Sequence, residues 1–333
     1  MRLPRASTWK KSNGARRPRV IVADDHVRVL ESVAGLLVDD FDVVAAVTDG
    51  RQAVDAALHL EPDAVLLDIT MPILDGVRAA EELRRMGSGA KVVFLTMHDA
   101  DEYVAAAIEA GGHGYVLKTR IHMDLMNALD HALSARLFLP SLTSLTTVAN
   151  SRSGDVHAVQ FRADERMPPA GVGGWLGASL QRGDLAAIVA GKAVRAGIVE
   201  QLEAAGYGAA DAARQGRWLV FDAEEALSQC VRSGRPDAGE VATFIDGLER
   251  SRVATAGASS RLTIFGEMSA LLLRDGNREG ALQLEHLWSE LTSGLPFLTV
   301  CCYPEECFGR RGHAEIFPQL CAEHAAVCAA PAA

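Results

Sequence analysis

The sequence predicts an α/β protein with two domains, each built on a parallel sheet. Short apolar runs of four or five residues alternate with helix-like stretches in both halves of the chain, as βαβ units require. The length of 333 residues also favours two domains. A polar stretch without periodicity, residues 137–154, separates the halves and is predicted to be a linker.

The first half shows the alternation most clearly. Four apolar runs are predicted to be buried strands: Arg19–Ala23, Ala64–Leu67, Lys91–Leu95 and Gly114–Leu117. Five stretches are predicted to be helices: Val27–Val38, Arg51–Leu60, Val77–Met86, Glu102–Ala110 and Met123–Ala135. Strands that alternate with helices in this way predict a doubly wound, flavodoxin-like domain over residues 19–136.

The second half shows the same alternation of predicted strands and helices, with different spacing. Its predicted strands are His157–Phe161, Ala186–Ala190, Trp218–Phe221, Leu262–Phe265 and Phe297–Cys301. Its predicted helices are Val194–Ala205, Glu224–Arg232, Glu240–Arg252 and Arg278–Leu291. These elements predict a second α/β domain over residues 155–310. A C-terminal helical tail, residues 311–333, is expected to follow, with its helix at Glu315–Cys328.

Composition indicates a globular protein and argues against several functions. Hydrophobic residues make up 49% and charged residues 23%, so the chain can bury a core. The net charge of −10 argues against a general polyanion binder. No apolar run approaches the ~20 residues of a bilayer span. Residues 1–18 are basic without an apolar segment, which predicts a disordered tail rather than a secretion signal. Six cysteines without such a signal indicate reduced thiols and a cytoplasmic location.

Chemically active side chains follow the predicted strands of the first half: Asp24, Asp25, Asp68, Thr96 and Lys118. Ligands of open parallel sheets bind in the crevice at the carboxyl ends of the strands. Three carboxylates, a hydroxyl and an ammonium would meet there, which suits a divalent cation together with a phosphoryl group. Taken alone, each of these residues is more often a helix cap, a turn residue or a surface charge. Their occurrence together, each after a predicted strand, favours a binding site for the cation and the phosphoryl group.

This order of motifs resembles the receiver domain of bacterial two-component response regulators. The acid pair, the string that begins at Asp68, Thr96, and the string from Tyr115 to Lys118 stand where that family has them, over about residues 18–140. The resemblance implies that Asp68 accepts a phosphoryl group. The donor would be a histidine kinase or a phosphotransfer protein.

The resemblance also implies a Mg²⁺ ion with oxygen ligands. Its ligands would come from Asp24, Asp25, Asp68 and the backbone carbonyl of Thr70. Of these, Asp24 would act through a water. Thr96 and Lys118 would contact the phosphoryl group, and Tyr115 would be a switch residue that becomes buried when Thr96 moves inward. The alternative for Tyr115 is an ordinary tyrosine packed at a sheet edge. Asp75 and Gly76 are expected to shape the turn into the next helix.

Motifs of the second half occur in the order of the MEDS sensory domain, named after methanogen, methylotroph and DcmR sensory proteins. They are His157, Leu180–Asp184, Gly234–Asp237, Phe265–Met268, Leu287–Leu291 and Cys302–Pro304. The resemblance covers about residues 155–308. It implies a degenerate relative of the KaiC and RecA ATPase core that senses small organic molecules.

Two residues of the second half are candidates for ligand contacts. Glu267 follows the strand Leu262–Phe265 at its crevice end, and His157 lies in the first strand. The alternatives are a first-turn helix acid for Glu267 and a core histidine for His157. The pair Gly191-Lys192 lacks the glycine-rich loop and the hydroxyl of a Walker A motif, so ATP turnover is not expected.

Cysteine and histidine crowd the C-terminal end of the chain. The residues are Cys301, Cys302, Cys307, Cys321, Cys328, His313 and His324. Structural zinc sites use tight pairs of ligands joined to a second tight pair, and no such second pair follows here. Buried free thiols are therefore the expected state of these cysteines.

The sequence predicts a response regulator that accepts a phosphoryl group and is not otherwise an enzyme, apart from slow autodephosphorylation. The second domain would bind a small organic ligand or a partner protein. Two alternatives stay open: a KaiC-like nucleotide-binding ATPase under receiver control, and a transcription regulator. A transcription regulator would need a recognition helix with a basic face, which the second half lacks. No specific DNA binding and no membrane association are expected.

Overall fold

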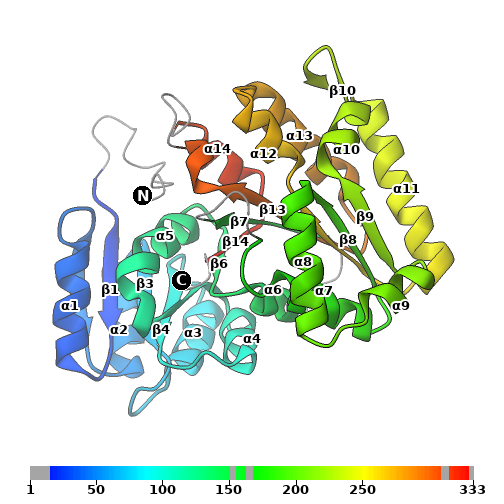
Figure 1. Ribbon diagram of the computed structural model, residues 1–333. Helices are drawn as coiled ribbons and strands as arrows, with labels where there is room; N and C mark the ends of the chain where they lie inside the picture. Colours follow the sequence, from blue (N-terminus) through cyan, green and yellow to red (C-terminus); the bar gives the residue numbers. More distant parts are fainter. Residues whose placement is uncertain (1–15, 151–154, 163–167, 309–314, 330–333) are drawn as a thin grey trace. The chain divides into compact units, whose positions relative to one another are not determined.

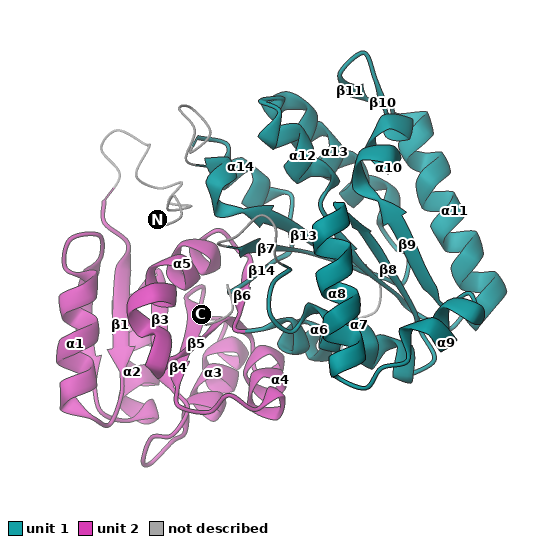
Figure 2. Ribbon diagram, in the orientation of Figure 1, with its two compact units in different colours: residues 1–4, 141–333 teal, residues 5–140 magenta. Residues whose placement is uncertain are grey.

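A computed structural model of the chain describes residues 16–150, 155–162, 168–308 and 315–329. The chain divides into two compact units, shown in Figures 1 and 2. We call them the N-terminal unit, up to residue 140, and the C-terminal unit, from residue 141 on. Most of the expected basic tail, residues 1–18, lies outside the described residues.

The N-terminal unit contains a parallel sheet. Its strands are β1 (Arg19–Ala23), β2 (Asp42–Val47), β3 (Ala64–Asp68), β4 (Lys91–Thr96), β5 (Gly112–Leu117) and β6 (Leu137–Leu139). The strand order is β2-β1-β3-β4-β5-β6, and every pair is parallel. The first five strands have the flavodoxin-like doubly wound order, which confirms the predicted fold class. Strand β3 is buried along its whole length, as a strand with helices over both faces must be.

All five predicted helices of this unit are present. They are α1 (Val27–Leu37), α2 (Gly50–Leu60), α3 (Gly76–Arg85), α4 (Asp101–Glu109) and α5 (Ile121–Leu133), and a 3₁₀ turn, η2 (Lys118–Arg120), precedes the last. Each buries one stripe against the sheet, as Leu30, Val33 and Leu37 do in α1. Helix α2 contacts α3, and α3 contacts α4, so these three form one layer (Figure 1).

The segment expected to be a linker, residues 137–154, is structured over its described part. Strand β6 extends the sheet beside β5, because Leu137, Phe138 and Leu139 are apolar and buried. A helix follows, α6 (Leu142–Asn150), in which Ser141 accepts a hydrogen bond from the backbone N–H of Ser144. Its buried residues recur every three or four positions, a period that the many serines and threonines obscure in the sequence.

The C-terminal unit has a second parallel sheet. Its strands are β7 (Val156–Arg162), β8 (Leu185–Ala190), β9 (Trp218–Asp222), β12 (Leu262–Gly266), β13 (Phe297–Pro304) and β14 (Ala326–Cys328). The strand order is β14-β7-β13-β12-β8-β9 with every pair parallel. The five predicted strands are all present, and β14 is an addition to the prediction.

Helices and a small hairpin complete this unit. They are α7 (Val172–Gln181), α8 (Lys192–Ala204), α9 (Ala209–Arg214), α10 (Ala223–Cys230), α11 (Ala238–Ala256), α12 (Met268–Arg274), α13 (Arg278–Thr292) and α14 (Phe317–Ala322), with β10 (Val231–Arg232) paired to β11 (Arg235–Pro236) and a 3₁₀ turn η3 (Glu305–Phe308). The four predicted helices correspond to α8, α10, α11 and α13. Helix α12 contacts α13, and α7 contacts α8 (Figure 1).

The expected C-terminal tail is part of the second sheet in its described residues. A helix was predicted over Glu315–Cys328, but α14 ends at Ala322. The chain then forms β14, which pairs in parallel with β7 in the register Ala326↔Ala158. The prediction failed because Ala326, Val327 and Cys328 are apolar residues that fit a buried strand as well as a helix.

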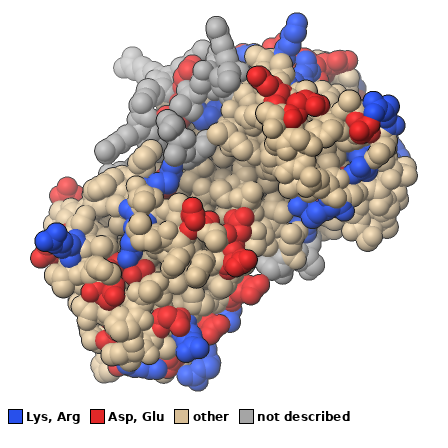
Figure 3. All heavy atoms as spheres, turned by 60° about the horizontal axis from the view of Figure 1, so that its bottom comes forward, with Lys and Arg blue, Asp and Glu red and all other residues tan. Residues whose placement is uncertain are grey.

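Charge on the described surface is mixed. On the face drawn in Figure 3, acidic and basic side chains are interspersed among other residues. The whole chain carries a formal charge of −10. Among the described helices, none combines the length and the apolar character that a bilayer crossing needs.

Candidate functional site

The register of the first sheet brings the predicted side chains together at the carboxyl ends of its strands. Ala23 pairs with Leu67, so Asp24 follows β1 beside Asp68 at the end of β3. Asp68 pairs in turn with Leu95, and Thr96 follows at the end of β4. Thr96 pairs with Leu117, and Lys118 follows at the end of β5.

Lys118 is the centre of this site. Its ammonium nitrogen lies 2.7 Å from Asp24 Oδ2 and 2.8 Å from Asp68 Oδ2. Asp24 is fully buried and Asp68 nearly so. Burial raises the pKa of Asp68, and the Lys118 ammonium offsets only part of that effect. Burial lowers the pKa of Lys118, but its bonds to Asp24 and Asp68 outweigh burial, so the net direction is upward.

The donor set at this pocket fits Mg²⁺. Asp24 and Asp68 share the Lys118 ammonium, and Asp25, the residue after Asp24, is the most exposed of the three acids, with 32% of its side chain accessible. The backbone N–H of Thr70 lies 3.4 Å from Asp68 Oδ1, so the turn after β3 stays close to the carboxylate. Carboxylate and carbonyl oxygens are the ligands that Mg²⁺ prefers. Asp25, Asp68 and the carbonyl of Thr70 would hold the ion directly and Asp24 through a water, which is the set that the family resemblance implies.

His26 is a polar neighbour of the acid pair. Its Nδ1 lies 2.6 Å from Asp25 Oδ1 and 3.6 Å from Asp24 Oδ1. These three side chains place their ligand atoms within 4.8 Å of one another. The backbone N–H of His26 also donates to Asp24 Oδ1, which fixes that carboxylate at the end of β1.

The backbone of His98 connects Thr96 with Tyr115. Its N–H donates to Thr96 Oγ1 at 3.0 Å, and its carbonyl accepts from the Tyr115 hydroxyl at 2.9 Å. The His98 ring lies 3.1 Å from the Thr70 hydroxyl and stacks on Tyr103. The Tyr115 ring is fully buried inside the unit.

The turn after β3 depends on Asp75 and Gly76. The Asp75 side chain caps α3 by accepting from the backbone N–H of Arg78 at 2.8 Å, as expected for a turn-shaping residue. Gly76 lies so close to β3 that an added Cβ would stand 2.1 Å from the carbonyl oxygen of Asp68. Only glycine allows the backbone at position 76 to lie this close to β3, so the start of α3 packs directly against the strand that carries Asp68.

The C-terminal unit has a crevice where the topology of its sheet reverses. Strands β7 and β13 are neighbours, yet the strands that follow them, β8 and β14, lie on opposite sides of the pair. Ligands of open α/β sheets bind at such switch points. A crevice of about 220 Å³ lies there, beside the paired strand ends Arg162 and Pro304. Its charged lining residues are Arg162, Lys192, Glu224, Glu267 and Arg274.

Glu267 lines this crevice, as the sequence predicted. Its Oε1 lies 2.5 Å from a guanidinium nitrogen of Arg162, and its Oε2 accepts from the backbone N–H of Gly191 at 3.1 Å. Burial raises the pKa of Glu267, against the opposing effect of Arg162. Gly191 is the glycine of the Gly-Lys pair. In a phosphate loop its backbone N–H would donate to a nucleotide phosphate, but here it donates to the Glu267 carboxylate.

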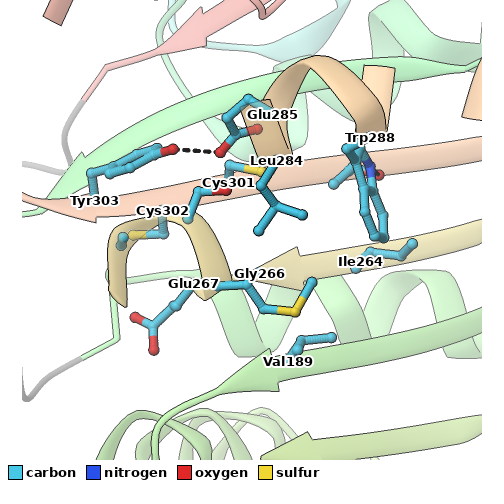
Figure 4. Close-up of a pocket in the computed structure, with 14 residues that line it drawn as sticks. Val189, Ile264, Gly266, Glu267, Leu284, Glu285, Trp288, Cys301, Cys302 and Tyr303 are labelled. Atoms are coloured by element: carbon cyan, nitrogen blue, oxygen red, sulfur yellow. Dashed lines mark hydrogen bonds between the residues drawn. The ribbon is translucent and has the colours of Figure 1, made fainter. Parts of the chain in front are cut away.

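His157, the other candidate for a ligand contact, is not among the residues that line the crevice. It is the second residue of β7, five residues before the carboxyl end at Arg162. At ~3.3 Å per residue, that separation is about 16 Å along the strand. The His157 ring is instead buried near Ser289, Glu285 and Cys301. Figure 4 shows the Glu267 carboxylate directed away from Glu285.

Comparisons with known proteins agree with this division. The response regulator receiver domain family matches residues 20–130, and the family of the MEthanogen/methylotroph, DcmR Sensory domain (MEDS) matches residues 156–319. The chain thus carries a response regulator receiver domain of two-component systems. A MEDS domain follows the receiver, over residues 156–319, which are just under half of the chain.

Two curated relatives are similar to part of the chain. The uncharacterized transcriptional regulatory protein YvfU of Bacillus subtilis is 37% identical over 128 residues, which are 38% of this chain and 64% of YvfU. The transcriptional regulatory protein PrrA of Mycobacterium bovis is 37% identical over 152 residues, 45% of this chain and 65% of PrrA. The chain therefore spans less than two thirds of these curated relatives.

A solved two-component response regulator of the LuxR family from Aurantimonas is also similar. It is 29% identical to this chain, and the TM-score is 0.38. The match covers 41% of this chain and 99% of that chain.

Proposed function

We propose that the protein is a response regulator whose N-terminal unit accepts a phosphoryl group on Asp68. The observation that carries this proposal is the bridge from Lys118 to both Asp24 and Asp68 at the strand ends. Asp68 is the last residue of β3, which is the middle one of the first five strands in the sheet order. A histidine kinase or a phosphotransfer protein would be the donor, as the receiver family implies.

The transfer needs little covalent chemistry from the protein. An oxygen of the Asp68 carboxylate forms a bond to phosphorus while the N–P bond of the donor phosphohistidine breaks, and the released imidazole takes up a proton from water. Lys118 attracts the phosphoryl oxygens as a point charge. Asp25, Asp68 and the carbonyl of Thr70 would hold Mg²⁺ directly and Asp24 through a water, and the ion would supply charge neutralisation at the same oxygens.

Thr96 and Tyr115 form the proposed switch. Both bond to the backbone of His98, one through its N–H and the other through its carbonyl. A phosphoryl group on Asp68 would offer the Thr96 hydroxyl a charged acceptor. Thr96 would then release the N–H of His98, and the loop after β4 would move together with the Tyr115 hydroxyl.

The C-terminal unit would act as the sensory or interaction domain. Its crevice of about 220 Å³ suits a small molecule with polar groups that can meet Glu267, Lys192 and Arg274. ATP turnover is not expected, because Glu267 already takes the backbone N–H of Gly191. A ligand there would control the receiver only through different affinities for two states of the protein.

Mass spectrometry of the intact protein tests the acceptor. With acetyl phosphate and Mg²⁺, the wild-type mass should rise by one phosphoryl group, and Asp68→Asn should remove this gain. The matched control is Asp75→Asn, which changes a nearby carboxylate but keeps an N-cap side chain. Labelling of Asp68→Asn to the wild-type extent would refute the assignment.

A further inference from the structure

A second cluster of metal-ligating side chains lies inside the C-terminal unit, away from its crevice. Its members come from β7, α13, β13 and the turn between α14 and β14. We call them the buried quartet: His157, Glu285, Cys301 and His324. Both histidines and the glutamate are at most 4% exposed. Neither the receiver chemistry nor the proposed crevice uses this cluster.

The ligand atoms of the quartet converge on one point. His157 Nε2 lies 3.2 Å from Glu285 Oε2 and 3.1 Å from Cys301 Sγ. His324 Nε2 lies 3.3 Å from the same Glu285 oxygen. All four ligand atoms are within 4.8 Å of one another. Ligand atoms at ~2.0–2.3 Å from a tetrahedral ion are separated by roughly 3.3–3.8 Å from one another. Small movements of the four side chains would therefore bring their ligand atoms to the distances that a tetrahedral ion needs.

Both imidazoles are oriented by their other nitrogen. Nδ1 of His324 lies 2.7 Å from the carbonyl oxygen of Leu320, so this nitrogen carries the proton. Nδ1 of His157 lies 2.8 Å from the hydroxyl of Ser289. That hydroxyl donates its own proton to the carbonyl of Glu323, so it accepts from His157. In each ring Nδ1 carries the proton, so the lone pair of Nε2 faces the other members of the quartet. Metal-bound histidines are oriented by the same kind of hydrogen bond from their second nitrogen.

This arrangement leaves electron pairs facing one another. Glu285 Oε2 and His324 Nε2 are both buried acceptors, and neither has a hydrogen-bond partner among the described residues. The other carboxylate oxygen, Oε1, accepts a hydrogen bond from the Tyr303 hydroxyl (Figure 4). Buried acceptors without a partner are costly, and a cation between them removes that cost.

The ligand types select the ion. Imidazole, thiolate and carboxylate in a closed set of four are the ligands of tetrahedral Zn²⁺. A hard ion such as Mg²⁺ would prefer an all-oxygen set. A thiolate and a carboxylate also balance two positive charges, so the loaded site would be neutral in a buried place.

We propose that the buried quartet binds one Zn²⁺ ion. Each histidine gives the Nε2 lone pair, Glu285 gives an oxygen, and Cys301 loses its thiol proton to water as the Zn–S bond forms. Glu285, Cys301 and Tyr303 also border a cavity of about 30 Å³, which is open space beside the site (Figure 4). The ion would tie α13 and the turn before β14 to the middle of the sheet.

The test uses the full chain, stripped with a chelator and kept in excess Mg²⁺ to occupy the receiver carboxylates. Zn²⁺ is titrated against a competing chromophoric chelator, and Co²⁺ serves as a spectroscopic substitute. We expect one Zn²⁺ per chain and, with Co²⁺, tetrahedral ligand-field bands plus a thiolate-to-cobalt charge-transfer band. Cys301→Ser should remove that last band, whereas the neighbouring Cys302→Ser should keep it.

Further variants separate binding from folding. Ser289→Ala should weaken Zn²⁺ by about 10–100-fold while leaving the four ligands in place. Zn²⁺ should raise the Tm of the wild type and of Asp68→Asn, but not of His324→Gln. A wild type without the thiolate band, or a Cys301→Ser variant that retains it, would overturn the proposal. The wild-type spectrum tests the site without any substitution, so its outcome does not depend on whether a variant folds.

Discussion

At the scale of single residues, Lys118 shows how the receiver tolerates buried acids. One ammonium faces two carboxylates, at 2.7 Å from Asp24 and 2.8 Å from Asp68. The side chain of Lys118 is only 12% exposed, so water screens these charges weakly. The same residue therefore serves stability in the resting state and would serve charge neutralisation during phosphoryl transfer.

Replacing Lys118 by methionine should destabilise the N-terminal unit. The change leaves two buried carboxylates without their cation, a loss on the order of 3–5 kcal/mol in the free energy of unfolding. Urea denaturation without Mg²⁺ measures it. Lys91→Met, in the same sheet, is the control, because the Lys91 ammonium nitrogen lies 3.4 Å from a histidine nitrogen, His113 Nε2, and not between two buried carboxylates. Equal stability of the two variants would contradict the role of Lys118.

His131 predicts how the unit responds to acid. It is 1% exposed in α5, and burial lowers its pKa from 6.5 to about 3. Below pH 6.5 the unfolded chain binds a proton that the folded chain takes up only near pH 3. Stability from the neutral ring is therefore present above pH 6.5 and is lost as the pH falls toward 3.

The slope from this one group should reach about 1.4 kcal/mol per pH unit. Urea denaturation between pH 6.5 and 4 should show a shallower decline for His131→Leu than for the wild type. His122→Leu changes an exposed histidine of the same helix and should follow the wild-type slope. Parallel curves for His131→Leu and the wild type would show that His131 is not the acid-sensitive group.

At the scale of elements, the junction of β3 with α3 positions the acceptor. The Asp75 cap begins α3, and the N–H of Gly76 donates to the carbonyl of Ile69 at 2.9 Å. The carbonyl oxygen of Asp68 then lies where a side chain at position 76 would stand. The backbone on both sides of the carboxylate is thereby fixed by a helix and a strand rather than by a free loop.

Gly76→Ala should disturb this junction. The added methyl group would meet backbone atoms that cannot turn away, so a cost of about 1–3 kcal/mol and a lower rate of acetyl phosphate labelling are expected. Gly89→Ala is the matched control, because nothing lies within 4 Å of its added Cβ. Wild-type labelling and stability in Gly76→Ala would show that the close approach is not needed.

The sequence carried enough information to predict the first unit and most of its site. Asp24, Asp68, Thr96 and Lys118 each follow a short apolar strand, and parallel strands must bring their carboxyl ends together. Strand β2 gave a weaker signal because it is half-exposed at the sheet edge. The segment around β6 and α6 was missed because its polar residues hide a buried stripe.

The buried quartet could not be found by spacing. Glu285 lies far from Cys301 in chain order, and His157 lies at the other end of the domain, so no short motif joins them. The expectation of free buried thiols rested on the absence of tight ligand pairs. It took the strand register, with His157 opposite Thr299 on neighbouring β13, to bring His157 to Cys301.

At the scale of the whole molecule, two units with different chemistry share one chain. A ligand in the C-terminal crevice and a phosphoryl group on Asp68 would each favour one state of the protein. Any coupling between them must be reciprocal in binding free energy. Everything in this scheme depends on which residue carries the phosphoryl group.

Borohydride trapping of the phosphorylated full chain identifies that residue most directly. Borohydride reduces an aspartyl phosphate to homoserine, so peptide mass spectrometry reads the modified position after labelling with acetyl phosphate and Mg²⁺. Our account predicts homoserine at position 68 alone, and none without Mg²⁺. Homoserine at position 24, 25 or 75 with residue 68 unchanged would contradict it.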